Sequence, residues 1–347
     1  MYLLRPARLE DLAQILELAR FLDSLNLPAD ESFLAQRLAR SERAFSQPGP
    51  PSHEREYQFV LVDETERAVG TCAILSKHGT PDSPHLYLRV REEERHSKSV
   101  EIRMQHHTLQ LQADTDGPSE LGALVLHPDT RGKPGWPGKL LSWGRFVYIA
   151  LHRACFEERV MAEMRATLDP EGRNAFWEAF GKRFTGMSYA EADRRSAVDK
   201  NFILELFPST PFYTTLLDEE VARELGQVHP ETRGALHLLE QAGLHWIGEI
   251  DPFDAGPFFG AALSQVIPVR ETRHVRVSRE APPRDADARI VSSEDGGQFR
   301  AIATRAALDG DQLRLSKDAH KRLDASPGDE VTVTPLPASR RGGKTHG

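Results

Sequence analysis

Apolar residues follow two different periods along most of this chain. Short runs dominated by apolar residues and bounded by proline, glycine or charged residues predict β-strands. These runs lie at 1–6, 57–62, 68–75, 85–90, 108–113, 121–126, 159–165, 202–207 and 245–250. Apolar residues that recur every three or four positions predict helices. Those stretches follow Asp11 and Gly138 and also cover 32–45, 174–181, 213–225 and 231–242, and the helix that ends at Gly181 is expected to lead into a further strand.

The pattern changes after residue 278. A connector rich in proline and aspartate occupies 280–288, and short β-like runs follow at 288–291, 299–304, 313–315 and 330–335. This texture predicts a small β-rich module at 279–336. The tail at 337–347, rich in arginine, glycine and lysine, is predicted to be disordered. A charged stretch at 91–98 is predicted to be a loop between two strands.

Composition excludes several classes of protein. The chain has 347 residues, 39% of them hydrophobic and 28% charged, which is ordinary for a soluble protein. No apolar run is long enough for a membrane span, and the first residues lack the pattern of a secretory signal. The net charge of −8 disfavours nucleic acid as a partner, and the histidines are not spaced like metal ligands, so no metal is expected. The only cysteines, Cys72 and Cys155, fit a reducing cytoplasm.

One segment, 119–151, combines a strand, a glycine-containing loop and a helix in that order. Glycines let the backbone approach a ligand closely, and the first N–H groups of the helix face an anion, so the segment predicts a phosphate-binding turn. The turn carries Gly132, Gly135, Gly138, Arg131, Lys133 and Lys139. Leu140 follows Gly138-Lys139, so this is no Walker A motif, and Gly-x-Gly-x-x-Gly is also absent.

The segment resembles the central motif of the acetyltransferase superfamily known as GNAT, in which a strand is followed by Arg-x-x-Gly-x-Gly around a coenzyme pyrophosphate. The resemblance assigns coenzyme contacts to Arg131, Gly135 and Gly138. The loop is about two residues longer than the usual pattern, and Pro134 and Pro137 remove two N–H donors. A plain glycine-rich turn between strand and helix is the alternative interpretation.

Further blocks resemble one family of this superfamily, the arginine N-succinyltransferases. They run in order over most of the chain, which makes them more specific than a single glycine loop. The blocks are Ser119-Glu120-Leu121, VMAEMR at 160–165, Phe176-Trp177 with GKRF at 181–184, Met187 with Ala192-Asp193, GQVHP at 226–230 and IDPFDAGP at 250–257. The resemblance implies transfer of a succinyl group from succinyl-CoA, as co-substrate, to the α-amino group of arginine.

The resemblance also implies roles for individual residues. His229 is expected to be the proton donor, and Leu124 is expected to contact succinyl-CoA. Backbone N–H groups near Leu124 and Leu126 would suit the oxyanion of the intermediate. The alternative for His229 is a cap before the following helix, because Pro230 suits the first position of a helix.

Four carboxylates lie in or beside the matched blocks. Glu120 is a candidate catalytic residue that would polarise the incoming amine. Glu163, Asp251 and Asp254 are candidates for binding the acceptor, because a carboxylate pairs with guanidinium through two parallel hydrogen bonds. Solvated or helix-capping carboxylates are the alternative, and this alternative is weakest for Glu163, which stands in an apolar strand.

These observations predict an α/β (α+β) protein with a GNAT-like mixed sheet flanked by helices. Residues 1–198 are expected to form the acyl-CoA-binding domain. Residues 199–278, with His229, are expected to extend that sheet or to form a second, partial GNAT-like half. The β-rich module completes the fold.

The sequence departs from the family at two places. Residues 21–28 read FLDSLNLP where a glycine-rich segment is usual, and residues 113–117 read ADTDG where asparagine and histidine are usual. Arginine is therefore the expected acceptor, with ornithine or another amino acid as an alternative. A further alternative is a catalytically weak subunit that binds coenzyme A and pairs with an active homologue; a third is an interaction protein that acts through the β-rich module. A cytoplasmic homo-oligomer, or a pair with a homologous subunit, is expected, with neither nucleic acid nor membrane as a partner.

Overall fold

The computed structural model describes residues 1–21, 27–169, 171–196 and 199–337. Its strands are β1 Leu3–Pro6, β2 Glu56–Val62, β3 Ala68–Leu75, β4 His85–Ser97, β5 Ile102–Asp114, β6 Ser119–Leu126, β7 Arg159–Glu163, β8 Phe212–Tyr213, β9 His245–Ile250, β10 Pro257–Ala262, β11 Arg273–Val277, β12 Ala288–Asp295, β13 Gln298–Arg305, β14 Ala307–Asp309, β15 Gln312–Arg314 and β16 Glu330–Pro335. Its α-helices are α1 Leu12–Ala19, α2 Glu31–Ser46, α3 Pro137–Leu151, α4 Lys182–Thr185, α5 Tyr189–Ser196, α6 Asn201–Leu206, α7 Glu219–Glu224, α8 Arg233–Ala242, α9 Ile267–Glu271 and α10 Lys317–Leu323.

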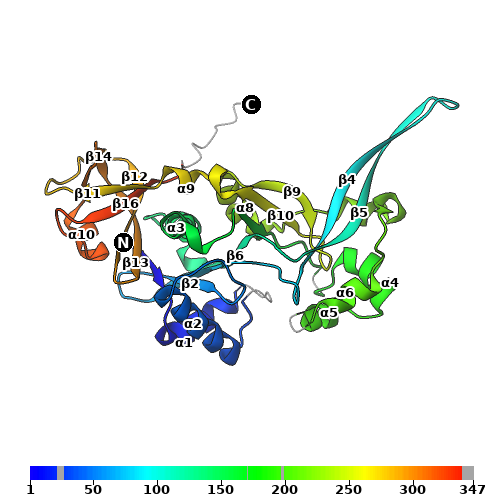
Figure 1. Ribbon diagram of the computed structural model, residues 1–347, viewed down its shortest axis with the longest axis horizontal. Helices are drawn as coiled ribbons and strands as arrows, with labels where there is room; N and C mark the ends of the chain where they lie inside the picture. Colours follow the sequence, from blue (N-terminus) through cyan, green and yellow to red (C-terminus); the bar gives the residue numbers. More distant parts are fainter. Residues whose placement is uncertain (22–26, 170, 197–198, 338–347) are drawn as a thin grey trace.

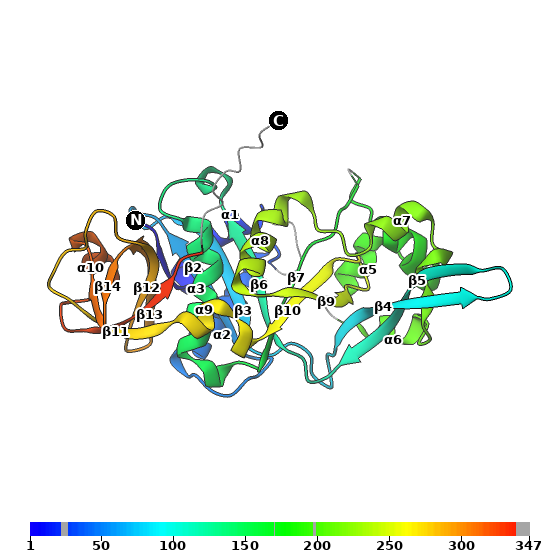
Figure 2. The ribbon, with the colours of Figure 1, turned by 90° about the horizontal axis from the view of Figure 1, so that it is seen from above.

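The described strands form one long mixed sheet (Figures 1 and 2). Its order is β14-β15-β11-β16-β12-β13-β1-β2-β3-β6-β7-β10-β9-β4-β5-β8. Neighbouring strands run antiparallel except for β6 beside β7 and β11 beside β15, which are parallel. This arrangement confirms the predicted α/β fold with a GNAT-like mixed sheet, flanking helices and a β-rich C-terminal part.

The middle of the sheet opens between β6 and β7. Only two residue pairs join these strands, Ser119 with Val160 and Glu120 with Met161. Beyond them, β6 stays paired with β3 on one side and β7 stays paired with β10 on the other. The two parallel strands therefore part toward their carboxyl ends and leave a wedge in the sheet.

A β-bulge lies in β6 beside this wedge. Cys72 of β3 faces both Ala123 and Leu124, because the register slips between Thr71 and Ala73. Ala123 takes a positive φ of 51°, which a residue with a side chain rarely adopts. A bulge leaves one residue of the strand outside the hydrogen-bond ladder, so β6 has an unpaired peptide at the wedge.

Helices cover both faces of this central sheet. α3 packs on one face against a core that includes Tyr57, Phe59 and Leu121, and α8 packs against α3. α1 and α2 cover the other face, above Val60 and Ala73. Figure 1 shows these two layers, with α3 on one side of β2 and the α1–α2 pair on the other.

A helical insertion lies between β7 and α8 and forms a third core with β4, β5 and the turn after β9. Its centre is Trp177, which is fully buried and stacks on Phe253 with ring centroids 5.5 Å apart. Figure 1 places α4, α5 and α6 on the same side of the sheet as α1 and α2, separated from them by a gap in the ribbon. The insertion and α2 therefore flank one face of the central strands.

Three predicted elements in this insertion are wrong. Residues 202–207 form the helix α6, not a strand, and Ile203 alone among 201–206 is fully buried. The helix predicted to end at Gly181 continues to Thr185 and ends at Gly186, where φ is 70°. Of the helix predicted at 213–225, only α7 is α-helical. Tyr213 belongs instead to β8, which pairs with β5.

The loop predicted at 91–98 is also wrong. β4 runs on to Ser97 and β5 begins at Ile102, so the two strands form a long hairpin that projects from the body (Figure 1). Cross-strand pairs of opposite charge hold it, including Arg103 with Glu94. Charged residues fill both faces of this ribbon because both faces meet solvent, and this removes the apolar alternation by which a strand is recognised.

The C-terminal strands continue the sheet through β13, in which Ala301 pairs with Leu4 of β1. β9 and β10 join β7 in the same sheet, so residues 245–262 extend it. The domain boundaries at residues 198 and 278 stay a prediction. The prediction of a disordered tail falls largely on residues 338–347, outside the described residues.

We expect Trp177→Ala to lower the free energy of unfolding by about 3–5 kcal/mol, because it removes the largest side chain of the third core. Urea denaturation followed by circular dichroism measures this loss. Trp246→Ala is the matched control, since Trp246 is 47% exposed and should cost less than about 1 kcal/mol. Equal losses for the two variants would contradict this account of the core.

Candidate active site

The predicted coenzyme turn follows β6. His127 caps a short 3-10 helix, Pro128–Thr130, and the chain then passes through Gly132 and Gly135, which both have positive φ. Trp136 takes the left-handed conformation immediately before α3. Arg131 and Lys133 are exposed, and the Arg131 Nε donates a long hydrogen bond of 3.4 Å to the carbonyl of Leu126. The turn therefore offers cations and a helix N-terminus at the mouth of the wedge.

Two side chains of this turn, Lys139 and Trp136, contact the C-terminal part of the protein. The Lys139 ammonium donates a hydrogen bond of 2.6 Å to the carbonyl of Pro337, and burial lowers its pKa. The Arg305 guanidinium lies over the ring of Trp136, 6.0 Å from its centroid. A Cβ atom on Gly138 would come no closer than 3.6 Å to another residue, so the first turn of α3 is open.

Leu124 and Leu126 lie on the last part of β6, at and beyond the bulge. Both side chains are half-buried and pack against the core under α3. The backbone around Ala123 and Leu124 therefore lines the wedge where β6 leaves β7. An unpaired N–H group at this place suits the negative oxygen that forms when an amine attacks a thioester.

His229 lies at the other side of the wedge. Its backbone N–H donates a hydrogen bond of 2.9 Å to the carbonyl of Arg165, the second residue after β7. Its Nδ1 accepts from the backbone N–H of Glu231 at 3.3 Å. A neutral imidazole that accepts at Nδ1 carries its proton on Nε2. His229 is therefore a half-buried helix cap, and this cap leaves Nε2 available, so the two interpretations from the sequence are compatible.

The same local structure occurs beside both strands of the wedge, directly after β6 and, at the end of the helical insertion, next to Arg165 beyond β7. His127-Pro128-Asp129 and His229-Pro230-Glu231 each begin a 3-10 helix with φ near −51° and ψ of 132° at the histidine. In each, the imidazole Nδ1 accepts the N–H of the acidic residue. One cap leads to α3 and the other to α8, and these two helices pack together beside the wedge.

A cavity of about 330 Å³ opens on the face that carries α1 and α2. Gly122 and Ala123 of the bulged strand form part of its floor, and Glu120 stands beside them. Residues from α2, from the loop between β3 and β4 and from the helical insertion complete its lining: Phe33, Arg37, Arg40, His53, Lys77, His78, Gly79, Thr80, Ser83, Pro84 and Lys200, with Glu56, Ala73 and Leu75. The cavity thus meets β6 at the bulge.

The cavity is cationic toward α2. Arg37 forms a buried ion pair with Glu56, and Arg40 lies 3.7 Å from the other oxygen of the same carboxylate, with its side chain 43% exposed. Lys200 faces them from the helical insertion. This wall suits an acyl group that ends in a carboxylate.

Glu120 is bound to a histidine that the sequence analysis did not select. Its Oε2 lies 2.6 Å from Nδ1 of His78, which is 42 residues earlier in the chain. Burial alone would raise the pKa of Glu120, but the charge of His78 and the hydrogen bond from its ring outweigh burial and lower the pKa to about 2. Glu120 is therefore ionised throughout the physiological range.

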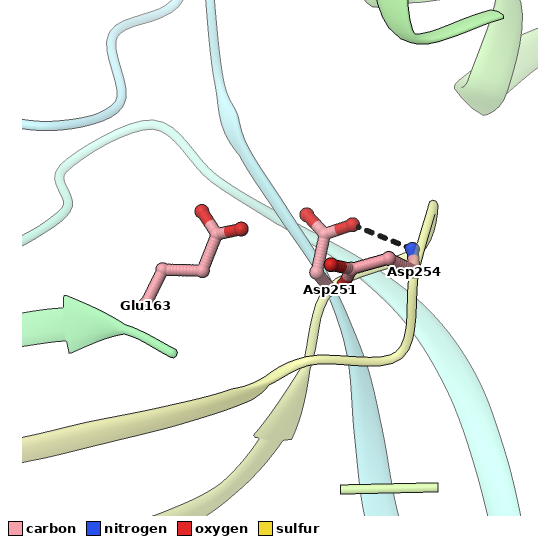
Figure 3. A group of neighbouring side chains, drawn as sticks. All are labelled: Glu163, Asp251 and Asp254. Carbon is pink, nitrogen blue, oxygen red and sulfur yellow. Dashed lines mark hydrogen bonds between the residues drawn. The ribbon is translucent and has the colours of Figure 1, made fainter. Parts of the chain in front are cut away.

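Glu163, Asp251 and Asp254 come together, as Figure 3 shows. Each offers a carboxylate oxygen within 4.8 Å of the others. Glu163 ends β7, and the two aspartates lie in the turn between β9 and β10, where the N–H of Asp254 donates 3.1 Å to Asp251. The pairing of β10 with β7 brings this turn to Glu163. Carboxylates so placed can hold an organic cation or a hard metal ion.

The three carboxylates repel one another. Burial, and then the charges of Asp251, Asp254 and Glu120, raise the pKa of Glu163 well above its ordinary value. Burial and the charge of Asp251 raise the pKa of Asp254 to about 7, and burial raises the pKa of Asp251. An empty cluster therefore keeps protons near neutral pH, and a cation bound there would release them.

The structure thus brings the predicted residues to two neighbouring places. Leu124, Leu126, Arg131 and His229 border the wedge, and Glu120, Glu163, Asp251 and Asp254 lie on or beside the adjoining face. Sequence reasoning missed His78, Arg40 and Lys200. The sequence gives no local pattern around them, and only the fold shows that they share a cavity with Glu120.

Comparisons with known proteins bear on the whole chain. A family profile described as "Arginine N-succinyltransferase beta subunit" matches residues 2–268, and one for the C-terminal domain of that subunit matches residues 273–335. An arginine N-succinyltransferase subunit beta of Pseudomonas aeruginosa is 36% identical over 343 residues, which cover 98% of this chain and 100% of the relative. An arginine N-succinyltransferase of Salmonella schwarzengrund is 36% identical over 346 residues, with 98% and 99% covered.

A solved structure is similar over the same extent. It is that of the arginine/ornithine succinyltransferase subunit AI from Pseudomonas aeruginosa, with a TM-score of 0.83 and 27% identity. The superposition covers 98% of this chain and 99% of that one. Within the described residues, no helix combines the length and the apolar character needed to cross a membrane.

The acidic cluster predicts how stability depends on pH. The ordinary pKa values of Asp and Glu are 3.8 and 4.5, and the fold raises the pKa of both Asp254 and Glu163. Between the ordinary and the raised pKa values, the folded state therefore binds more protons than the unfolded state. Stability contributed by these groups therefore falls as the pH rises through this window, up to about 7 for Asp254. Glu163→Gln removes one of the repelling charges.

We expect Glu163→Gln to raise the free energy of unfolding relative to the parent protein, by about 1–2 kcal/mol near pH 8 and by much less near pH 5. Denaturant titrations at both pH values measure this difference. Glu158→Gln is the control, because its side chain is 87% exposed. A gain that is the same at both pH values would contradict the repulsion argument.

Proposed function

The chain belongs to the arginine N-succinyltransferase family, and we propose from this that it transfers the succinyl group of succinyl-CoA to the α-amino group of L-arginine. The observation that carries the proposal is the match of both family profiles and of full-length relatives across nearly the whole chain. The activity is therefore that of an acyltransferase, with an amino acid and an acyl-CoA as substrates.

We assign the donor to the wedge between β6 and β7. The pyrophosphate of succinyl-CoA would meet Arg131, Gly135 and Gly138 at the start of α3, where exposed cations and the helix N-terminus favour an anion. The pantetheine arm would run between the strands past Leu124 and Leu126. This path brings the thioester to the bulge at Ala123.

The succinyl group differs from an acetyl group by a terminal carboxylate. In our assignment this carboxylate points into the cavity that begins at the bulge and meets the cations near α2. Arg40 is the best placed of them to form a bidentate pair, because its contact to Glu56 is long and Arg37 already holds that carboxylate. A preference for succinyl over shorter neutral acyl groups follows from this placement.

The acceptor brings a guanidinium and an α-ammonium to the same face. Glu163, Asp251 and Asp254 supply the negative charge that a guanidinium needs, and this charge increases as the site releases protons on binding. Lys200 lowers the pKa of Asp251 as a minor influence after burial, so it lies near enough to meet the α-carboxylate of the same amino acid. We propose this orientation for arginine.

The proposed acyl transfer makes and breaks bonds in a fixed order. The neutral α-amine attacks the thioester carbon, the carbonyl oxygen becomes an oxyanion at the β6 bulge, and the C–S bond breaks. The nitrogen loses one proton as the tetrahedral intermediate collapses, and the departing thiolate takes one from Nε2 of His229. The proton lost by the nitrogen restores His229 through solvent. The products are N-succinylarginine and coenzyme A.

We expect the purified protein to release a thiol from succinyl-CoA when arginine is present. A colorimetric thiol assay with arginine, ornithine, lysine and glycine measures this, and mass spectrometry of the product locates the new amide. Arginine should give the highest kcat/KM, because three carboxylates match the charge and planarity of guanidinium. Binding of succinyl-CoA with no turnover on any amino acid would instead support the alternative of a catalytically weak subunit.

We expect His229→Ala to lower kcat by about 10²–10³-fold and to leave the KM for both substrates nearly unchanged, because the proton donor acts on the leaving thiolate. Steady-state kinetics with succinyl-CoA and arginine give both parameters. His107→Ala, at an exposed position on the β4–β5 hairpin, is the control. Unchanged turnover in His229→Ala would remove this residue from the mechanism.

Two further assignments from the sequence stay proposals. The names of two matched proteins contain the word "subunit", which supports an assembly of this chain with itself or with a homologue. A cytoplasmic location rests on the amino-acid composition and on Cys72 and Cys155, which are both free and buried. A metal ion is not part of the proposed reaction.

A further inference from the structure

The cavity contains an imidazole–carboxylate pair whose role the assignments above leave open. His78 Nδ1 and Glu120 Oε2 lie 2.6 Å apart, and both side chains line the cavity beside Gly122. Glu120 is buried, and the side chain of His78 keeps 21% of its surface exposed. The imidazole is thus held at one nitrogen and open at the other end of its ring.

The backbone around His78 is fixed. Its N–H donates 2.8 Å to the carbonyl of Pro118, directly before β6. Gly117 packs so closely on the carbonyl of His78 that a Cβ atom there would lie 2.1 Å from the oxygen. His85 meets the His78 ring edge-on, with centroids 4.8 Å apart. These contacts leave the ring little freedom to turn away from the cavity.

The acceptor amine poses a chemical requirement that Glu120 does not meet. Arginine arrives mainly as an ammonium ion near neutral pH, and the nitrogen must lose a proton before or during attack. A carboxylate is an ordinarily weak base, and Oε2 of Glu120 is already engaged by the ring of His78, so Glu120 has little driving force for this step. An imidazole has the basicity that the step needs.

The ion pair also defines which nitrogen of His78 is reactive. A carboxylate accepts hydrogen bonds, so Nδ1 of His78 carries a proton and donates a hydrogen bond to Glu120. In the neutral ring Nε2 then has a free lone pair. Among the described residues, the structure records no hydrogen-bond partner for Nε2 of His78.

We propose that His78 is the general base of the reaction and that Glu120 positions it. This inference rests on the proposed function, and it changes the role expected for Glu120 from direct contact with the amine to orientation of an imidazole. Nε2 of His78 takes one of the three protons of the α-ammonium, the freed lone pair forms the new C–N bond, and Glu120 stabilises the imidazolium. The nitrogen loses its second proton when the C–S bond breaks, and this proton replaces the one that His229 gives to the thiolate.

The positions of the two histidines support this division of tasks. His78 lies on the cavity face with the carboxylates, where the acceptor is expected, and His229 lies at the carboxyl end of β7, where the thiol leaves. Glu120 and Glu163 stand on adjacent strands, and the charge of Glu120 reaches Glu163. An acceptor bound to the acidic cluster would therefore present its amine close to His78.

Several charged groups surround His78. Glu120 on β6 is in direct contact, and His85 on β4 lies against the ring. Lys77 precedes it in the loop but is paired with Asp116 and Glu157. Lys200 of the helical insertion lines the same cavity, and Asp251 lies near enough for His78 to influence its pKa.

The test compares pH profiles of kcat/KM for arginine. We expect His78→Gln to lose about 10²-fold near neutral pH and to recover as the pH rises, because above the pKa of the amine the substrate arrives without its extra proton. The KM for succinyl-CoA should change less than about twofold. Glu120→Gln should keep the hydrogen bond but remove the charge, so the acidic limb of the profile moves to lower pH with an intermediate loss.

A second measurement separates catalysis from structure. His78→Ala should regain part of its activity when imidazole is added, because the cavity has room for a free ring, and His107→Gln should match the parent protein in every assay. A fixed loss across the pH range, with no recovery by imidazole and no shift in Glu120→Gln, would overturn the inference.

The outcomes also distinguish this inference from the proposed function. If the parent protein does not turn over arginine and succinyl-CoA, the proposed function fails and His78 is not at issue. If the parent protein is active and His78→Gln keeps both its rate and its pH profile, the proposed function stands and His78 is not the base.

Discussion

The molecule depends on one geometric constraint, the early parting of β6 and β7. Two residue pairs join them, and each strand then keeps a different partner, β3 or β10. Because β10 and β9 stay with β7, their turn brings Asp251 and Asp254 to Glu163. Because β6 stays with β3, its bulge remains over the cavity beside α2. In the proposed function, the same opening separates a donor side from an acceptor side and joins them at Ala123.

The pKa values of the acidic residues around this opening are shifted in opposite directions. Glu120 has a histidine partner that lowers its pKa, whereas Glu163 has mainly other carboxylates as neighbours, and burial and their charges raise its pKa. Two glutamates on adjacent strands thus differ in protonation because their surroundings differ, as is common where carboxylates divide acid, base and binding roles. In the proposed function, the charge of Glu120 orients the imidazole of His78, and the protonated cluster of Glu163, Asp251 and Asp254 binds a cation.

Much of this could be predicted from the sequence where local patterns and matched blocks coincide. The β6–turn–α3 segment, the hairpin of β2 and β3 and the acidic residues Glu163, Asp251 and Asp254 were all identified, because each lies in a short apolar run or a family block. The helix α6 and the long β4–β5 hairpin were not. α6 is a helix of six residues that buries only Ile203, and the hairpin is charged on both faces, so neither carries the periodicity on which the predictions rest.

The pairing of His78 with Glu120 was beyond the reach of sequence reasoning for a different reason. The two residues are 42 positions apart, and His78 belongs to a loop whose length and composition indicate only a turn. Their contact exists because Pro118 anchors His78 directly before β6 and Gly117 leaves room for that approach. A histidine cap such as His229 can be inferred from its following proline, but an imidazole presented by a crossing loop is visible only in three dimensions. In the proposed mechanism, proton removal and proton return fall to residues that different parts of the chain position, one from the loop before β4 and one from the insertion after β7. This separation allows the amine to be deprotonated on one side of the thioester while a proton is kept ready for the thiolate on the other.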